Sequence, residues 1–171
     1  MSTILEDSFC VSGHPMRILD RGAFLHELQQ RIESSCQENT LLGLVLIRIQ
    51  RCEDVNNVFG YEAGNQLCMN MIGRIAGILR KDDIIRRISD DTFVLVMPKL
   101  KNLDHANLAA NRMLDITEEP FELGSNTITA NIAMGISFFP EHAQDATSMF
   151  QLATIALLGA INTHVGFIVS T

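Results

Sequence analysis

The sequence predicts an α/β (α+β) fold in which helices cover a mixed, mostly antiparallel sheet. Three observations indicate it. Helical and strand-like apolar periods alternate along the chain, two pairs of strand-like runs are joined by short polar turns, and residues 41–49 are almost all aliphatic. The paired runs are typical of β-hairpins, and the aliphatic run is typical of a central strand covered on both faces. At 171 residues the chain has the length of one domain.

The predicted elements follow the order αβαββαββαβ. Helices are predicted at 21–37, from the polar turn at 50–54 to residue 80 with a bend near Gly60 and Gly64, from the capping residue Asn102 to 116, and at 147–163. Strands are predicted at 41–49, 84–88, 92–97, 121–123, 127–139 and 165–169, and Pro98 is expected to end the first hairpin. Residues 1–18 show no clear period, so we interpret them as a lead-in or linker and assign the domain to residues 19–171.

Charge and composition narrow the classes of function. A net charge of -7 argues against sequence-independent binding to nucleic acid, which depends on clustered Lys and Arg, but it is compatible with a local basic pocket. The four cysteines form no C-x-x-C pair and have no His close by, so we expect free thiols in a reducing compartment rather than a zinc or disulfide framework. No signal-peptide pattern and no run of membrane-span length is found, and a cytoplasmic location is expected.

One segment carries a specific likeness to a known family. Arg80, Asp83 and Arg87 precede the residues Ser-Asp-Asp-Thr-Phe at 89–93. In frame and spacing this segment resembles the signature of GGDEF domains, the diguanylate cyclases, in which R-x-x-D and a further Arg precede G-G-D-E-F.

Two further segments fit the same family. Residues 56–65 are similar to its N-D-x-x-G-H-x-x-G-D, and residues 132–140 to its S-I-G-I-A…P run, so that the likeness covers residues 19–169. It implies the palm-like fold shared with nucleotide cyclases and polymerases. An active member joins two GTP molecules into cyclic di-GMP, each held by one protomer of a dimer together with two divalent cations.

The departures from the family pattern bear on catalysis. Two-metal phosphoryl chemistry needs carboxylates that converge on the ions. The resemblance places Arg48 where the family has an Asp at the end of the central strand, and Thr92 where it has the Glu of the signature, which leaves Asp91 as the remaining expected ligand. Ser89 and Asp90 replace the glycines that approach the triphosphate. We therefore expect that Mg²⁺ binding and catalysis are lost and that no cofactor is bound.

The positions that read guanine in the family are half kept. Asn56 matches the family Asn, whereas Asn65 replaces the family Asp. An amide can still pair with guanine without the assistance of a charge, so weak or no GTP binding is expected. Turn or capping roles for both asparagines are at least as well supported by the sequence.

The R-x-x-D site is the part that stays intact. In the family it captures the product. An Arg fork can bind guanine O6 and N7, and a carboxylate can accept from N1 and N2, which assigns these contacts to Arg80 and Asp83. Arg87 would then contact a phosphate of the ligand. The alternative is an ordinary surface pair between Asp83 and cations at a helix end, and Arg48 has the alternative of a structural ion pair.

The leading hypothesis is a catalytically inactive GGDEF-like domain that serves as a regulatory or receptor module for cyclic di-GMP. A second hypothesis is an interaction or dimerisation module that binds no nucleotide and controls a neighbouring phosphodiesterase (EAL) domain or protein partner, with a homodimer as one form. The uncharged helix predicted near the C-terminus suits such contacts, because a lone surface helix should have a polar side. A residual diguanylate cyclase ranks last.

Overall fold

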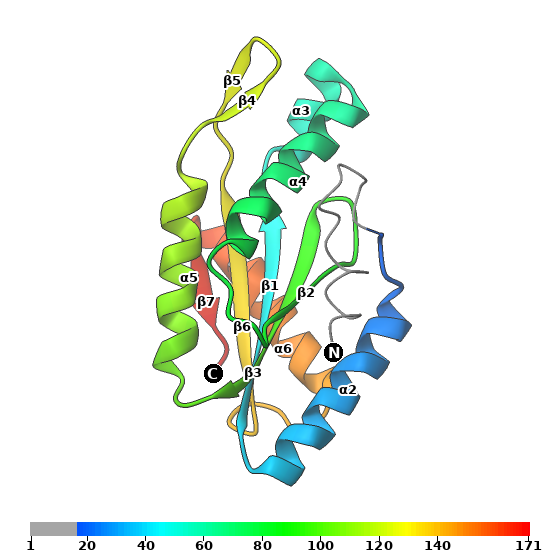
Figure 1. Cartoon of the computed structure of the whole chain (residues 1–171), viewed down its shortest axis with the longest axis vertical. Coiled ribbons are helices and arrows are strands. Elements are labelled where there is room, and N and C mark those ends of the chain that lie inside the picture. Colours follow the sequence, from blue (N-terminus) through cyan, green and yellow to red (C-terminus); the bar gives the residue numbers. More distant parts are fainter. Residues whose placement is uncertain (1–16) are drawn as a thin grey trace.

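The core of the molecule is a five-stranded sheet with the strand order β2-β3-β1-β6-β7 (Figure 1). The structure is a computed structural model that describes residues 17–171. The strands of the sheet are β1 (Leu41–Ile49), β2 (Ile84–Arg87), β3 (Thr92–Leu100), β6 (Ile132–Phe139) and β7 (Phe167–Val169). β1 pairs antiparallel with β3 and β6, β2 pairs antiparallel with β3, and β7 pairs with β6 in parallel. The predicted mixed, mostly antiparallel sheet is confirmed.

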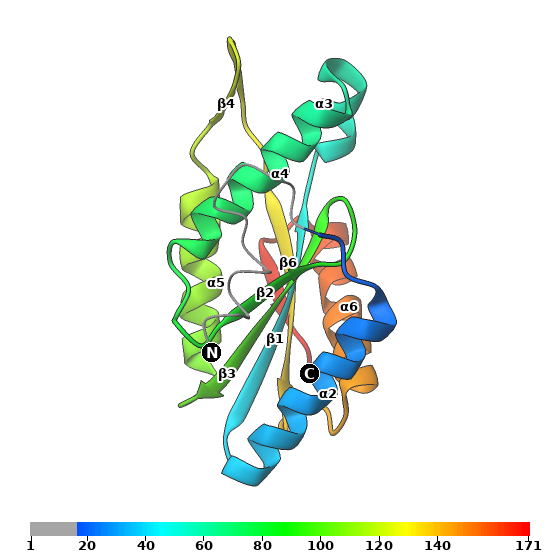
Figure 2. The same ribbon diagram turned by 45° about the vertical axis from the view of Figure 1, so that its right-hand side comes forward.

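Helices cover both faces of this sheet. They are α2 (Arg21–Glu38), α3 (Cys52–Phe59), α4 (Tyr61–Ala76), α5 (Asp104–Thr117) and α6 (Ala146–Thr163). Figure 2 shows α4 and α5 on one side of the sheet and α2 and α6 on the other. Alternate residues of β1 therefore enter opposite apolar clusters: Val45 and Ile47 lie in the cluster with α4 and α5, and Leu44 lies in the cluster with α2 and α6. The aliphatic run forms the expected central strand.

The long helical stretch divides where the sequence predicted a bend. α3 ends at Gly60, whose φ of 93° is a conformation that only glycine adopts at little cost, and α4 begins at the next residue. The chain stays helical through Gly64, so the second expected bend is absent, and α4 ends at Ala76 rather than near residue 80.

The first hairpin is longer than predicted. β3 continues to Leu100, and the expectation that Pro98 ends it is wrong. The pairing with β2 ends at Val96, and the pairing with β1 has a register shift opposite this part of β3. A proline lacks the N–H of a regular ladder, and it is tolerated here because the ladder is irregular at this point.

The second predicted hairpin also differs. β4 (Phe121–Leu123) pairs with β5 (Asn126–Ile128) in a separate two-stranded hairpin, which projects at the top of Figure 1, while β6 joins the main sheet. The predicted strand at 127–139 is broken between Ile128 and Ile132, where the backbone bonds to residues that follow β1. The carbonyl oxygen of Asn131 accepts from the backbone N–H of Gln50, and that of Thr129 accepts from Arg51.

The assignment of residues 1–18 as a linker falls almost wholly outside the described residues. At the start of the described part, Ile18 forms an isolated parallel bridge with Arg87, and the Leu19 N–H donates to the Arg87 carbonyl oxygen at 2.7 Å. Residues 18–19 therefore lie along the outer edge of β2.

The uncharged helix α6 packs closely on β6. The carboxylate of Asp145 caps it by accepting from the backbone N–H and the hydroxyl of Ser148, and these bonds lower the pKa of that carboxyl. α6 is long and apolar enough to span a membrane by length and composition alone, where the sequence analysis expected no such run. In the fold its Met149 and Ala153 are buried against the sheet. The helix thus contributes six of the 18 buried residues of the second apolar cluster.

The contact between α6 and β6 depends on Gly135. A Cβ at this position would lie 2.1 Å from the Ala153 carbonyl oxygen and 2.3 Å from the Leu157 nitrogen, so Gly135→Ala requires α6 to move. We expect the free energy of unfolding to fall by about 1–3 kcal/mol, measured by urea denaturation. Gly73→Ala is the matched control, because a Cβ there meets nothing within 4 Å and the helix should gain about 0.5–1 kcal/mol. Equal stability of Gly135→Ala and the unchanged protein would contradict this packing.

Candidate functional site

The hairpin tip between β2 and β3 lies against the end of β1. The backbone N–H of Ile49 donates to the carbonyl oxygen of Asp91 at 2.9 Å, and Arg48 is the register partner of Thr92. The structure therefore brings together Arg48, Asp91 and Thr92, the three positions at which the family pattern has metal-binding carboxylates. The end of β1 and the hairpin tip therefore lie side by side.

The polar groups of this site bond to each other. Arg48 Nε donates to Thr92 Oγ1 at 3.5 Å, and among residues 17–171 Arg48 takes part in no ion pair, so the alternative of a structural ion pair is wrong. Asp91 Oδ1 accepts from the Ser89 hydroxyl at 3.1 Å and from the Thr92 hydroxyl at 3.0 Å. In the described part of the chain, no three His, Cys, Asp or Glu side chains gather closely enough to hold a metal ion.

These side chains do not fit two divalent cations. A pair of divalent cations requires several carboxylates, whereas this site has the single carboxylate of Asp91, which already accepts from two hydroxyl groups. A guanidinium about 5 Å from a dication would repel it by on the order of 6 kcal/mol at an effective dielectric constant of about 20. No metal-dependent step is therefore derived for this chain.

Arg87 is buried beneath the hairpin tip, with 2% of its surface exposed. Its Nε donates to the Ser89 carbonyl oxygen at 3.1 Å, Nη1 to Asn65 Oδ1 at 2.8 Å and Nη2 to the Asp90 carbonyl oxygen at 2.7 Å. The guanidinium also lies over the Phe93 ring. All three nitrogens of the guanidinium donate within the protein. Arg87 therefore presents no exposed donor for the phosphate contact that the sequence predicted.

The two asparagines lie inside helices, not at turns or caps. Asn65 of α4 offers its side-chain oxygen to Arg87. Asn56 of α3 packs against Gly64, where its Oδ1 is buried and has no hydrogen-bond partner among the described residues. The turn and capping roles are therefore wrong. Asn65 Oδ1 is directed to Arg87, and Asn56 Oδ1 is directed to Gly64.

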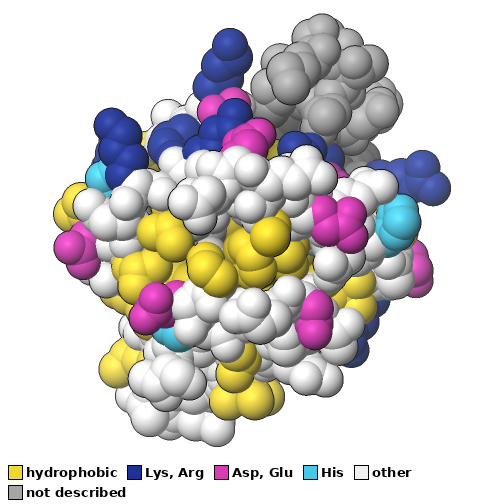
Figure 3. Space-filling view, turned by 90° about the horizontal axis from the view of Figure 1, so that it is seen from below, with side chains coloured by type: hydrophobic (Ala, Val, Ile, Leu, Met, Phe, Trp, Pro, Cys, Tyr) yellow, Lys and Arg dark blue, Asp and Glu magenta, His cyan; other side chains and the backbone are white. Residues whose placement is uncertain are grey.

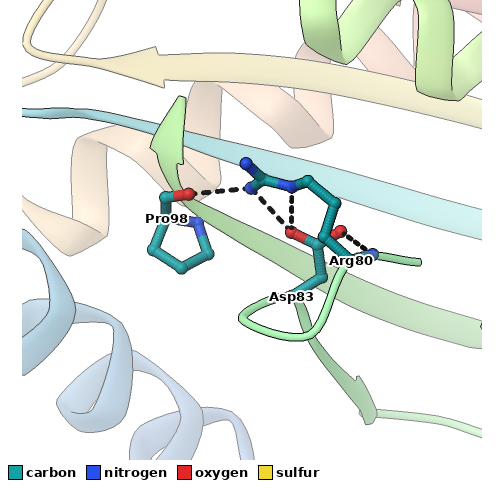
Figure 4. Close-up of polar contacts among 3 residues, drawn as sticks. All are labelled: Arg80, Asp83 and Pro98. Carbon is teal, nitrogen blue, oxygen red and sulfur yellow. Dashed lines mark hydrogen bonds and ion pairs between the residues drawn. The ribbon is translucent and has the colours of Figure 1, made fainter. Parts of the chain in front are cut away.

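Arg80 and Asp83 form a tight pair in the loop between α4 and β2 (Figure 4). The two carboxylate oxygens take three bonds: Oδ1 accepts from Arg80 Nε at 3.0 Å and from Nη2 at 2.8 Å, and Oδ2 accepts from the Arg80 backbone N–H at 2.8 Å. Arg80 Nη2 also donates to the Pro98 carbonyl oxygen at 2.7 Å. The pair is not at a helix end, since α4 stops at Ala76.

The two members of this pair differ in exposure. The side chain of Asp83 is 1% exposed, whereas that of Arg80 is 41% exposed. The simple surface-pair interpretation is wrong for Asp83. Nη1 of Arg80 has no hydrogen bond within the described part of the chain, so this nitrogen is the donor that the site can offer to a ligand.

Comparison with known proteins identifies the family to which this fold belongs. The sequence profile of the family described as "Diguanylate cyclase, GGDEF domain" matches residues 17–165. The chain belongs to the GGDEF family. The element order, the central antiparallel sheet and the hairpin at 84–100 are thus those of a GGDEF domain.

Relatives support this assignment at low sequence identity. Diguanylate cyclase TpbB of Pseudomonas aeruginosa is 24% identical over 139 residues, which cover 81% of this chain and 32% of TpbB. Cyclic di-GMP phosphodiesterase PdeR of Escherichia coli is 25% identical over 157 residues, which cover 92% of this chain and 23% of PdeR. The chain thus spans less than a third of the length of these two relatives, and GGDEF domains occur in proteins with both activities.

Solved GGDEF domains have the same fold. The crystal structure of the TpbB domain from Pseudomonas aeruginosa has a TM-score of 0.84 at 23% identity and covers 90% of this chain and 97% of that domain. The domain of DgcB from Caulobacter crescentus, solved in complex with cyclic di-GMP, has a TM-score of 0.78 at 14% identity, with 95% of each chain covered.

Two contacts near the site were not indicated by the sequence. The hydroxyl of Tyr61 donates to Asp90 Oδ1 at 3.1 Å, which connects the start of α4 to the hairpin tip. The sulfur atoms of Cys52 and Cys68 lie 2.7 Å apart between α3 and α4. Cys52 fell in the predicted polar turn at 50–54, and only the crossing of α3 and α4 brings the two cysteines together.

Replacing Arg87 by methionine tests its role in holding the tip. Arg87→Met keeps much of the buried volume but leaves Asn65 Oδ1 and two carbonyl oxygens without their donor. We expect the free energy of unfolding to fall by at least about 2 kcal/mol in urea denaturation. Arg112→Met, at an exposed position of α5, should change it by less than about 0.5 kcal/mol. Similar small effects of both variants would show that Arg87 does not hold the tip.

Proposed function

We propose that this GGDEF domain is catalytically inactive and acts as a regulatory module in cyclic di-GMP signalling. The observation that carries the proposal is the position of Arg48, whose guanidinium lies beside Thr92 and the hairpin tip. A cyclase needs two cations at this strand end, and here a fixed positive charge takes the place of a chelating carboxylate. The related domains of TpbB and PdeR support a role in this signalling system.

The inactive state is tested directly with substrate. Purified chain incubated with GTP and Mg²⁺ or Mn²⁺ should form no cyclic di-GMP above the protein-free blank, as measured by anion-exchange chromatography. An active diguanylate cyclase assayed in parallel is the positive control. Product that grows in proportion to protein concentration, and that disappears with Asp91→Asn, would establish a residual cyclase and contradict the proposal.

The proposal includes cyclic di-GMP as the ligand, bound at the Arg80–Asp83 pair. Asp83 holds Arg80 Nε and Nη2, which leaves the two hydrogens of Nη1 without an acceptor among the described residues, on a side chain that is 41% exposed. Guanine presents two acceptors, O6 and N7, on one edge, and one charged nitrogen can donate to both. The buried carboxylate of Asp83 already holds the Arg80 guanidinium in place, so the loss of side-chain entropy on ligand binding is small. In this form of the proposal, Arg87 fixes the hairpin tip and does not contact phosphate.

Calorimetric titration with cyclic di-GMP tests this contact. We expect a dissociation constant in the micromolar range for the unchanged chain and a loss of binding of at least about tenfold for Arg80→Ala, since a charge-assisted bond is worth about 1.5–3 kcal/mol. Lys81→Ala is the matched control, because it removes the adjacent exposed charge and leaves the pair with Asp83 intact. It should bind like the unchanged chain. Equal weakening by both variants would mean non-specific attraction, and no heat of binding with the unchanged chain would overturn the receptor proposal.

A second candidate function is an interaction module that binds no nucleotide. Figure 3 shows hydrophobic side chains gathered on the end of the molecule opposite the β4–β5 hairpin. Elsewhere α6 exposes Ile155 at 67% and Leu158 at 47% on a helix without charge. Such apolar surface favours contact with another protein surface, as in an adjoining domain. A chain that binds neither GTP nor cyclic di-GMP would favour this function.

A further inference from the structure

Cys52 and Cys68 form a buried pair of thiols between α3 and α4. Cys52 is the first residue of α3 and is 5% exposed, and Cys68 lies in the middle of α4 and is 1% exposed. Their sulfur atoms are 2.7 Å apart, about 0.7 Å more than the roughly 2.05 Å of a disulfide bond. The thiols therefore need only a small approach to bond to each other.

Close packing of the two helices holds the thiols in this position. One turn along each helix, Asn56 of α3 contacts Gly64 of α4, and a Cβ on Gly64 would lie 1.7 Å from Asn56 Oδ1. The same Cβ would lie 3.2 Å from the Cys52 carbonyl oxygen. The missing side chain of Gly64 thus allows the close crossing. The turn at Gly60 joins the helices directly, so the two sulfur atoms cannot separate without disturbing this contact.

The two thiols are chemically unequal. Cys52 lies at the N-terminus of a helix, a position that favours a thiolate, and Cys68 has no such neighbour. The hydrogen bond from Cys68 lowers the pKa of the Cys52 thiol, while the same bond and burial raise the pKa of Cys68. Among the nearby charges, Asp91 acts to raise the pKa of both thiols and Arg87 acts to lower it. Cys52 is therefore the better nucleophile of the pair, and Cys68 is placed to attack the Cys52 sulfur once that sulfur is oxidised.

We propose that Cys52 and Cys68 are a redox-sensitive pair that peroxide converts into an intramolecular disulfide. The Cys52 thiolate attacks one oxygen of hydrogen peroxide, which gives a sulfenic acid and, after protonation of the departing hydroxide, one water. The Cys68 sulfur then attacks the sulfenic sulfur, the S–S bond forms, and a second water leaves. Two thiols are oxidised and one peroxide is reduced. A small oxidant suits a pair with exposures of 5% and 1%, which a bulky disulfide cannot reach.

The bond would act on the hairpin tip through α4. Asn65 lies one helical turn before Cys68 and accepts from Arg87, and Tyr61, at the start of the same helix, donates to Asp90. A covalent link between the helices would therefore fix the donors and acceptors that hold residues 89–91. This consequence does not depend on whether the domain binds a nucleotide.

The test uses the whole chain with the other two cysteines replaced, as the variant Cys10→Ser/Cys36→Ser. Cys36 is exposed, and its removal prevents links between molecules. After treatment with hydrogen peroxide, the protein should lose the mass of two hydrogen atoms and resist N-ethylmaleimide even when unfolded. Peptide mapping should join residues 52 and 68, and dithiothreitol should reverse the change. Closing a loop between residues 16 apart should raise the thermal midpoint by roughly 6–12 °C.

The same measurements contain the outcomes that overturn the proposal. Full alkylation of both thiols after peroxide treatment would show that they are packing residues only. Oxidation of Cys52 to sulfinic acid without a link to Cys68 would show that Cys68 does not resolve it. A third variant, Cys10→Ser/Cys36→Ser/Cys68→Ala, removes the resolving thiol and should give a trapped sulfenic acid on Cys52 that a dimedone probe labels. If that variant does not fold, the mass and midpoint of the parent variant still decide the question.

Discussion

A buried guanidinium organises the part of the molecule where a GGDEF domain has its active site. Arg87 is 2% exposed, and a charge in such a place costs several kcal/mol unless its donors are satisfied. The backbone carbonyl oxygens of Ser89 and Asp90 and the side-chain oxygen of Asn65 satisfy them. The hairpin tip and α4 must therefore keep their relative positions. The tip of this hairpin is held by bonds from the Arg87 side chain beneath it.

The remaining polar groups of the site are also directed inward. Arg48 donates to Thr92, the Asp91 carboxylate accepts from Ser89 and Thr92, and Tyr61 bonds to Asp90. Groups that would contact metal and phosphate in a cyclase thus take part in internal bonds. Arg80 is the exception, because its Nη1 has no acceptor among the described residues while Asp83 holds the other side of the guanidinium. This contrast between an internally bonded active site and one open cationic position is what a regulatory domain would need.

The sequence predicted those elements well whose position follows from the spacing of their apolar residues alone. The aliphatic run of β1, the hairpin of β2 and β3 and the uncharged helix α6 lie where expected. The prediction failed where the end of an element depends on a contact with residues distant in the sequence. The alternation through Ile128, Ala130 and Ile132 continues across the break between β5 and β6, and only the bonds from Gln50 and Arg51 explain that break.

The site shows the same division. The in-frame motifs assigned Arg48 and Thr92 to the same site, and the pairing of β1 with β3 brings the two residues together. The motifs were not enough to show which way a long side chain turns. Arg87 was expected to face a ligand and instead lies under the hairpin tip, since the tip supplies carbonyl acceptors that no motif records. The meeting of Cys52 and Cys68 likewise follows from a helix crossing that small residues permit.

The central claim is that a cation cannot bind at the end of β1 because Arg48 is there and the carboxylates are not. Electron paramagnetic resonance of free Mn²⁺ measures this most directly, in a titration of the chain with Mn²⁺ and GTP. The signal of the unchanged chain should equal that of Mn²⁺ and GTP without protein, whereas the variant Arg48→Asp/Thr92→Glu should reduce it by restoring two carboxylates beside Asp91. A reduction by the unchanged chain equal to that of the variant would contradict the account.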